Sequence, residues 1–278
     1  MLQEYTPASH APRADTVSLV KRLLKLLLFT LATGYVALCI LLFVVQRRLV
    51  FPAPVELLNV VGMERVDVPD ATFFLWKHVP GDGPVVVHFH GNGEQVGTLG
   101  WLADAWAARG ASFVAVEYPG YPGTEGTPSE EALVRTSEAA LRHLSTVLKV
   151  NRSRLVLEGQ SVGTGVAVEL ASRGWGTKLV LISPYTTLPD VAARAFQWIP
   201  VRLLMRDRFD SASRGPGLTV PTLIVHGTRD GVVPFELGEA LSKVIAGAKF
   251  VAVNGAGHND VLDRQMVQSA IFDFVASP

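Results

Sequence analysis

From about residue 63 onward, short apolar runs alternate with longer amphipathic segments. The apolar runs are rich in Val, Leu and Ile and almost continuous, a pattern typical of strands that are covered on both faces of a parallel sheet. We expect eight strands, at residues 65–68, 72–79, 84–89, 112–117, 154–158, 178–182, 222–225 and 249–253.

The segments between these runs have helical periodicity. Helices are expected at residues 96–109, 129–149, 162–173, 235–246 and 260–275. Alternation of strand and helix requires right-handed crossovers and places helices on both faces of the sheet. The predicted fold class is therefore α/β, with a mostly parallel eight-stranded sheet flanked by helices. Residues 184–218 break the alternation and form an insertion, with one or two short helices expected at 192–198 and 201–205.

The N-terminal part has a different pattern. Residues 26–45 contain no charged side chain, and as a helix they would span about 30 Å, the thickness of the hydrocarbon core of a bilayer. A cleaved signal peptide is the main alternative, but its apolar region is normally shorter and is followed by a small-residue cleavage site. We therefore expect an N-terminal tail (1–25), an uncleaved transmembrane helix (26–45), a linker (46–62) and one catalytic domain (63–278).

Basic residues flank this apolar segment unequally. The flanking residues are Arg13, Lys21, Arg22 and Lys25 before it and Arg47 and Arg48 after it. The positive-inside tendency then favours a cytoplasmic N-terminus. The expected location is a membrane, with a single pass and the catalytic domain on the non-cytoplasmic side.

Composition bears on the size of the core and on which partners, disulfides and metal sites are possible. Hydrophobic residues make up 49% of the 278 residues and charged residues 18%, which is enough apolar material for a substantial core. Lys plus Arg and Asp plus Glu both number 25, so nothing favours a polyanionic partner, and no nucleic-acid motif is present. The single cysteine, Cys39, excludes an intrachain disulfide and a cysteine-based zinc site. We expect no metal and no cofactor, and the oligomeric state is not predicted.

Gly159-Gln160-Ser161-Val162-Gly163 fits the G-x-S-x-G nucleophile elbow. In that motif a sharp turn between a strand and a helix lifts the serine hydroxyl clear of the sheet, and the glycines remove Cβ atoms that would clash. The motif follows the expected strand at 154–158 and opens the helix at 162–173. The alternative, a tight turn with a capping serine, explains the glycines equally well but not this placement. Ser161 is the predicted nucleophile.

A serine hydroxyl needs a histidine base, and the histidine needs a carboxylate to orient it. Asp230 follows the seventh strand and His258 lies in a glycine-rich loop after the eighth, in the chain order Ser, Asp, His that this motif requires. The carboxyl ends of these strands share the edge at which open α/β sheets place their sites. Asp190, after the sixth strand, is the one competing acid. His226 ends a strand and is interpreted as structural.

A tetrahedral intermediate also needs two convergent N–H donors. One is expected from Val162, the residue after the nucleophile, and the other from the loop His90-Gly91-Asn92-Gly93 that ends the third strand. Asn92 is the first choice for this second donor and Gly93 the alternative. The predicted oxyanion hole is thus Asn92 and Val162.

From about residue 46 the chain resembles the membrane-anchored, small-cap branch of the α/β-hydrolase domain-containing proteins, a branch that includes protein depalmitoylases. The matching segments are QRRLVFP (46–52), FHGNG (89–93), EYPGYPGTEGTPSE (117–130), GQSVG (159–163), SPYTTLPD (183–190), RDRFDS (206–211), VPTLIVHGTRDGVVP (220–234) and GAGHNDV (255–261). The resemblance implies the nucleophile, acid and base at Ser161, Asp230 and His258, and a short cap at about 184–218. One departure is Gly93, where alanine is expected.

These observations favour a serine esterase or thioesterase that cleaves carboxylic ester bonds through an acyl-Ser161 intermediate. A small-molecule or lipid-type acyl substrate is expected, and an S-acylated protein is a further candidate. Two alternatives stay open: a serine peptidase of the same fold, and a catalytically silent membrane scaffold. The sequence does not identify the acyl chain, because that depends on the shape of the pocket under residues 184–218.

Overall fold

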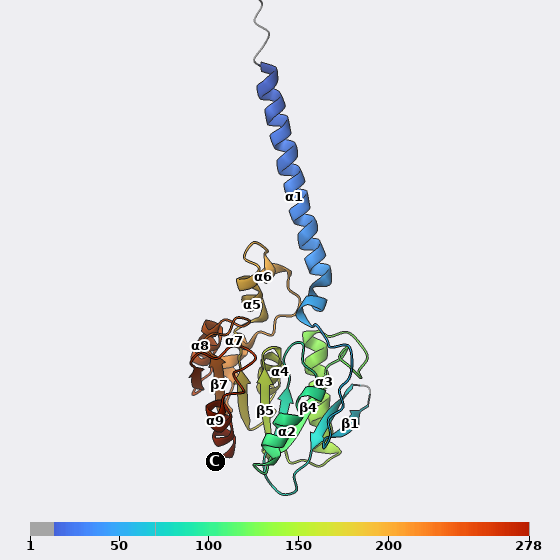
Figure 1. Ribbon diagram of the computed structural model, residues 1–278, viewed down its shortest axis with the longest axis vertical. Coiled ribbons are helices and arrows are strands. Elements are labelled where there is room, and N and C mark those ends of the chain that lie inside the picture. The colour runs from blue at the N-terminus through green and yellow to red at the C-terminus, as the bar shows by residue number, and fades with distance from the viewer. Residues whose placement is uncertain (1–13, 70, 278) are drawn as a thin grey trace, which may run out of the picture. The chain divides into compact units, whose positions relative to one another are not determined.

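The computed structural model describes residues 14–69 and 71–277. Two compact units meet at the peptide bond between Val45 and Gln46. The first contains most of helix α1 (Ala14–Val50), which is the one helix in the described ranges that is long and apolar enough to cross a membrane. The second unit, from Gln46 onward, contains every strand and the remaining helices that the structure describes (Figure 1).

The second unit is built on an eight-stranded sheet in the order β1-β2-β4-β3-β5-β6-β7-β8. The strands are β1 (Glu64–Val68), β2 (Thr72–Lys77), β3 (Val85–Phe89), β4 (Ser112–Val116), β5 (Leu155–Gln160), β6 (Lys178–Ile182), β7 (Thr222–Gly227) and β8 (Lys249–Val253). Strands β1 and β2 pair antiparallel, β2 runs antiparallel to β4, and every later pairing is parallel. The predicted fold class is confirmed.

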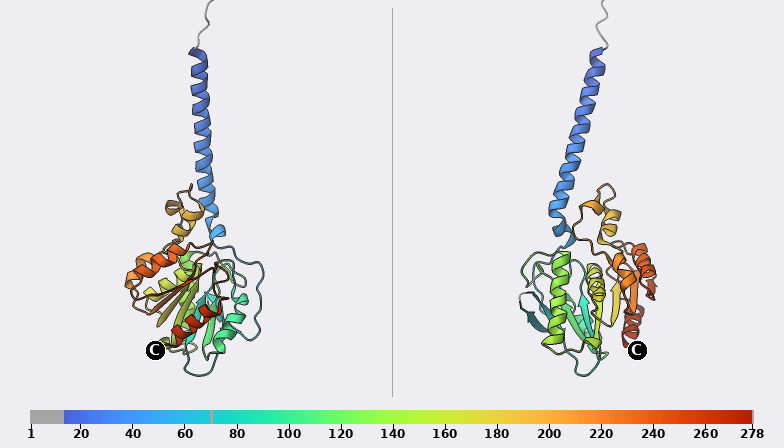
Figure 2. Two further views of the ribbon diagram at one scale, coloured as in Figure 1. Left: turned by 60° about the vertical axis from the view of Figure 1, so that its left-hand side comes forward. Right: turned by 180° about the vertical axis from the view of Figure 1, so that it is seen from behind.

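Helices cover both faces of the sheet (Figure 2). On one face α3 (Glu130–Thr146), α4 (Val162–Ser172) and α8 (Phe235–Val244) pack onto the sheet, and on the other lie α2 (Gly100–Ala107) and α9 (Gln265–Ala276). Each face has its own buried cluster, because side chains alternate across a strand and both sides of β3 to β7 are apolar.

Several element bounds differ from the sequence prediction. The helix expected at 96–109 is divided at Leu99 into a 3₁₀ turn (Val96–Thr98) and α2. The last helix begins at Gln265 instead of residue 260, because residues 254–264 form the loop that holds His258. Helix α1 continues to Val50, five residues beyond the apolar segment, and ends just before Pro52, which would interrupt a helix.

The insertion at 184–218, called the cap from here on, contains three short helices, α5 (Leu188–Ala195), α6 (Val201–Leu204) and α7 (Ser211–Arg214). The first was expected at 192–198. It begins earlier because the Thr187 side chain accepts a hydrogen bond from the backbone N–H of Asp190, and because Pro189 suits the first turn of a helix. The cap lies between β6 and β7, beside the carboxyl ends of the parallel strands.

Candidate active site

Ser161 lies between β5 and α4 with φ +52° and ψ −121°. Positive φ is uncommon for a residue with a Cβ atom and costs about 1–3 kcal/mol, so the surrounding structure must hold it there. The Ser161 N–H donates to the Ile182 carbonyl on β6 (2.9 Å), and Thr164 donates its hydroxyl to the Ser161 carbonyl (2.6 Å). These bonds hold the strained turn that the motif requires.

The two glycines of the motif permit close approach of backbone to backbone. A Cβ atom on Gly159 would lie 2.5 Å from the Gly163 carbonyl oxygen. One on Gly163 would lie 2.0 Å from the Phe89 carbonyl oxygen at the end of β3. Both distances are shorter than any tolerated contact, so only glycine lets α4 begin against the end of β3.

Asp230 and His258 are in direct contact. His258 donates its Nδ1–H to Asp230 Oδ2 across 2.7 Å, and the Asp230 side chain is fully buried. The other carboxylate oxygen, Oδ1, accepts the backbone N–H groups of Val232 (2.9 Å) and Val233 (2.8 Å). Because Nδ1 carries the proton that Asp230 accepts, the neutral imidazole has its lone pair on Nε2.

A further histidine shares this carboxylate. His226 Nε2 lies 3.3 Å from Asp230 Oδ2 and 3.0 Å from the Val233 carbonyl oxygen. Burial alone would raise the pKa of Asp230, but hydrogen bonds from His226 and His258 and from the Val233 N–H hold it well below its ordinary value. The sequence indicates only a structural role for His226 and not this contact with Asp230. The four-residue spacing between His226 and Asp230 is the one feature of the sequence that could have indicated it.

Ser161 does not bond to this pair directly. Within residues 14–69 and 71–277, no hydrogen bond joins Ser161 Oγ to His258. Such bonds often tighten only when substrate is bound. Ser161 instead shares the wall of one cavity with Gly231, Val232 and Val233, the residues that follow Asp230.

The competing acid, Asp190, has other partners. It accepts hydrogen bonds from the Thr186 hydroxyl (2.7 Å) and from the Arg202 guanidinium (2.9 Å) within the cap. Burial opposes ionisation of Asp190, yet these hydrogen bonds and the Arg202 charge lower its pKa. The Asp190 carboxylate therefore links residue 186, before α5, to Arg202 in α6 within the cap.

The loop after β3 approaches Ser161, the predicted nucleophile. A Cβ atom on Gly91 would lie 3.4 Å from Ser161 Cβ, so the Gly91 backbone lies next to the serine side chain. In the described part of the chain, the backbone N–H groups of Asn92 and Val162 have no acceptor. Gly93, the alternative donor, has φ +74°, where glycine avoids the strain that an alanine would bring.

A buried ion pair lies beneath this loop. His90 Nε2 donates to Glu117 Oε1 (2.9 Å) and His90 Nδ1 donates to the Gly91 carbonyl (2.9 Å). A histidine that donates from both nitrogens is an imidazolium. Burial by itself would lower the pKa of His90, but Glu117 and the Gly91 carbonyl together raise it. The Glu117 carboxylate also accepts the N–H groups of Val96 (3.1 Å) and Tyr118 (3.0 Å).

The hydrogen bond from His90 to the Gly91 carbonyl orients the peptide group between Gly91 and Asn92. The Gly91 carbonyl and the Asn92 N–H belong to the same peptide group, and in a trans peptide they point in opposite directions. Holding the carbonyl toward His90 therefore directs the Asn92 N–H to the opposite side. The sequence contained no sign of this role for His90, because its partner Glu117 follows β4 and lies 27 residues away in the chain.

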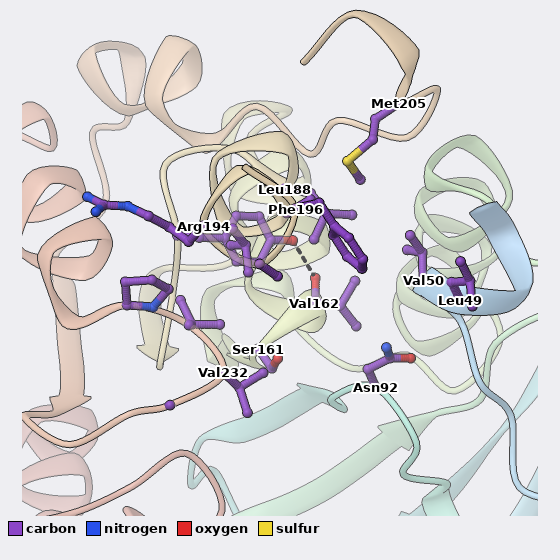
Figure 3. A pocket seen from close by; sticks show the side chains of 17 residues that line it. Leu49, Val50, Asn92, Ser161, Val162, Leu188, Arg194, Phe196, Met205 and Val232 are labelled. Carbon is purple, nitrogen blue, oxygen red and sulfur yellow. Dashed lines mark hydrogen bonds between the residues drawn. The ribbon is translucent and has the colours of Figure 1, made fainter. Parts of the chain in front are cut away.

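Ser161 opens into a cavity of about 550 Å³ (Figure 3). Asn92 and Val232 lie at its floor beside Ser161, Leu49 and Val50 line one side, and cap residues line the top. Apart from Asn92, Ser161, Tyr185 and Arg194, the lining consists of apolar residues and one glycine. Arg194 is the one charged residue that lines it within the described ranges. The same ranges contain no group of three His, Cys, Asp or Glu side chains able to hold a metal ion.

Comparison with known proteins identifies related sequences and folds. The family model "Serine aminopeptidase, S33" matches residues 83–216, and the model "TAP-like protein" matches residues 203–278. An uncharacterized protein of Mycobacterium tuberculosis is 37% identical over 198 residues, which are 70% of each chain. Alpha/beta hydrolase domain-containing protein 17C of Xenopus tropicalis is 33% identical over 184 residues, 66% of this chain and 58% of that protein.

Solved structures share the architecture at lower identity. An esterase from Exiguobacterium antarcticum has a TM-score of 0.60 and 22% identity, over 77% of this chain and 99% of the esterase. An esterase from Pyrococcus furiosus has a TM-score of 0.65 and 14% identity, over 80% of this chain and 98% of that chain. At these identities the likeness concerns the fold.

Proposed function

The chain belongs to the α/β-hydrolase family, and on that premise we propose that it is a serine hydrolase that cleaves carboxylic esters or thioesters. The observation that carries the proposal is the strained Ser161 at the floor of an apolar cavity, beside the hydrogen-bonded pair Asp230 and His258. A lipid-type acyl chain suits such a cavity, and an S-acylated protein is a further candidate substrate.

The proposed reaction has two halves. His258 Nε2 takes the proton of Ser161 as Oγ attacks the acyl carbon, and the resulting oxyanion accepts the N–H groups of Asn92 and Val162. The intermediate collapses, the C–O or C–S bond breaks, and His258 protonates the leaving alcohol or thiol. Water, deprotonated by His258, then attacks the acyl-Ser161 ester; the bond from the acyl carbon to Oγ breaks, His258 returns the proton to Ser161 Oγ, and the carboxylic acid is released. Asp230 stabilises the imidazolium in both halves.

A serine peptidase is the second candidate, because one matching family model carries an aminopeptidase description. An aminopeptidase must bind a free ammonium group, for which a carboxylate is the usual partner. No Asp or Glu side chain lines the cavity within the described ranges, and the Arg194 side chain extends away from Ser161 (Figure 3). A described lining without a carboxylate favours an ester or thioester over the N-terminus of a peptide.

The N-terminal helix supports a membrane anchor for this enzyme. It is apolar over a length that suffices to cross a bilayer. An anchored domain would meet lipid-borne acyl groups. The unequal basic flanks favour the non-cytoplasmic side for the catalytic domain, and a protease-protection assay on intact vesicles tests that orientation.

Covalent labelling tests the nucleophile. The full-length chain should react with a fluorophosphonate probe at Ser161, and Ser161→Ala should abolish labelling and lower turnover of a soluble acyl ester by about 10⁶-fold. Circular dichroism should show an intact fold in the variant. A folded wild-type chain that is not labelled supports the scaffold alternative, and near-normal turnover by Ser161→Ala contradicts the assignment.

A further inference from the structure

Three large apolar side chains are exposed on the cap. Phe196, Trp198 and Leu203, called the cap tip, have exposed fractions of 48%, 89% and 83%. They lie at the end of α5, in the turn that follows it, and in α6. A cluster of this kind on a soluble surface marks a site of interaction with a protein or a membrane.

The exposed charges around the cap tip are mostly positive, and one of the arginines, Arg202, is paired with Asp190 of α5. Between residues 191 and 209 the exposed charged side chains are all arginines, at positions 194, 202, 206 and 208. The one acidic residue in this stretch, Asp207, is buried. Tryptophan together with arginine is the composition of segments that lie at a membrane interface, and arginine is attracted to anionic lipid headgroups.

The cap is bonded to the residues that directly follow the apolar N-terminal segment. Gln46 donates its side-chain amide to the Leu204 carbonyl (3.3 Å) and accepts the Arg206 N–H (2.8 Å). Arg47 pairs with Asp207 through Nε–Oδ2 (3.0 Å). These contacts lie within the second unit, and they hold residues 204–207 beside Gln46 and Arg47, where that unit begins.

This attachment places the cap tip within reach of a bilayer. If residues 26–45 span the hydrocarbon, as in the proposed function on which this inference rests, Gln46 lies at its boundary. Leu203 is three residues from Arg206, so their Cα atoms are at most about 11 Å apart. The polar layer of a bilayer leaflet is about 5–8 Å thick. Leu203 thus lies within about 11 Å of a residue that is bonded to Gln46, a reach comparable with the thickness of the headgroup layer, and its contact with that layer is part of the proposal that follows.

We propose that the cap tip is a docking surface for an anionic lipid bilayer, with Trp198 and Leu203 inserted at the headgroup level and the exposed arginines at 194, 206 and 208 near lipid phosphates. Phe196 belongs both to the cap tip and to the cavity that contains Ser161. Docking thus brings lipid acyl chains to the edge of the cavity, and the substrate is taken from the membrane phase.

Site-specific fluorescence tests the docking. In a Cys39→Ser background, Leu203→Cys carries an environment-sensitive fluorophore and the full-length chain is placed in phosphatidylcholine vesicles containing phosphatidylserine. Met266→Cys, on α9 with 61% of its side chain exposed, is the matched control. Spin-labelled lipids should quench the fluorophore at 203 strongly and the one at 266 weakly.

The outcomes separate this proposal from the one on which it rests. Equal quenching at the two positions in a chain that co-floats with vesicles overturns the docking alone. A chain that does not co-float overturns both the anchor and the docking. Neither readout needs turnover, so a failure of the hydrolase assignment is detected separately, by probe labelling at Ser161.

A double variant tests the consequence for substrate supply. Trp198→Ser with Leu203→Ser should lower hydrolysis of a long-chain ester embedded in vesicles by about tenfold, because the apolar contact with the bilayer is lost. Hydrolysis of a short water-soluble ester should be unchanged. Equal loss on both substrates would mean damage to the site and would contradict the docking role.

Discussion

Individual residues around Ser161 hold strained or charged states that only their neighbours explain. Ser161 itself keeps a positive φ because β6 and Thr164 bond its backbone on both sides. Asp230 stays ionised although it is buried, because two histidines and two backbone N–H groups surround its carboxylate. His90 stays protonated between Glu117 and the Gly91 carbonyl.

The hydrogen bond from His90 Nδ1 to Gly91 should control the oxyanion donor at Asn92. In His90→Asn the side-chain amide nitrogen lies near the former Nδ1 and can still donate to Gly91, whereas in His90→Gln the amide reaches toward Glu117 instead. We expect His90→Gln to lower kcat on a soluble ester by up to about 10²-fold, and His90→Asn to retain most of the activity. Steady-state kinetics should show KM little changed in both.

His88 provides the control for these variants. It is two residues earlier on β3, equally buried, and paired with Glu158 through Nδ1 (2.8 Å). His88→Asn should lower stability without changing kcat per folded molecule. If His88→Asn and His90→Gln lower kcat alike, the loss reflects damage to β3 and the role assigned to His90 is wrong.

The lowered pKa of Asp230 predicts a pH dependence of stability. A carboxyl group whose pKa is lower in the folded state stabilises the fold above its unfolded pKa, about 3.9, and this contribution is lost as pH falls through the folded pKa. Urea unfolding of the wild type and of Asp230→Asn in detergent should therefore give a larger difference in free energy at pH 7 than at pH 3. A difference independent of pH would contradict the shift.

At the scale of elements, the site depends on how closely α4 begins against β3. Strand β5 pairs with β3 through residues 85–89 and 155–159, and the first turn of α4 lies over the end of β3. The approach brings the Val162 N–H beside the loop that carries Asn92. The glycine at position 163 is what permits it.

Gly163→Ala should separate these elements. The added Cβ atom would lie 2.0 Å from the Phe89 carbonyl oxygen, so backbone must move, and overpacking of this kind costs about 1–3 kcal/mol in the free energy of unfolding. Activity should fall as well, because the backbone N–H groups of Asn92 and Val162 would move apart. Gly217→Ala, where a Cβ atom meets nothing within 4 Å, should change stability by no more than about 0.5 kcal/mol. Urea denaturation and ester hydrolysis measure both effects.

At the scale of the whole second unit, from Gln46 onward, the cap is joined to other elements by contacts with distant parts of the chain. Asp207 pairs with Arg47 and also accepts the Glu130 N–H (2.9 Å) at the start of α3. Glu130 in turn accepts the N–H groups of Arg208 (2.7 Å) and Phe209 (2.9 Å). The C-terminal part of the cap is thus bonded both to Arg47, in the last turn of α1, and to α3.

Arg47→Ala should loosen the cap. It leaves the buried Asp207 carboxylate without its cationic partner, at an expected cost of about 1–3 kcal/mol. Hydrogen exchange should become faster in residues 204–209 of the full-length chain in detergent. Arg48→Ala, which removes an adjacent exposed arginine that forms no ion pair in the described part of the chain, should leave this exchange unchanged. Equal protection in both variants would show that Arg47 does not brace the cap.

The sequence predicted the strands more accurately than the helices of the cap. Each of the eight strands overlaps its expected range, because nearly continuous Val, Leu and Ile runs have few other stable environments. The helix α5 was expected four residues too late, since the prediction followed apolar periodicity and not the capping by Thr187 and Pro189. Arg47 was counted only among the basic residues that flank the apolar segment, because its partner Asp207 is 160 residues away.

Local pattern determined what local physics controls: the α/β alternation, the apolar N-terminal helix, and the serine, aspartate and histidine that follow strand ends. Tertiary structure decided which of these side chains meet. The contact between Asp230 and His258 needs β7 beside β8, the contact between His90 and Glu117 needs β3 beside β4, and the cavity above Ser161 needs the cap to fold back over it. Such contacts join residues far apart in the chain, and their energies come from burial and pairing that no local segment contains.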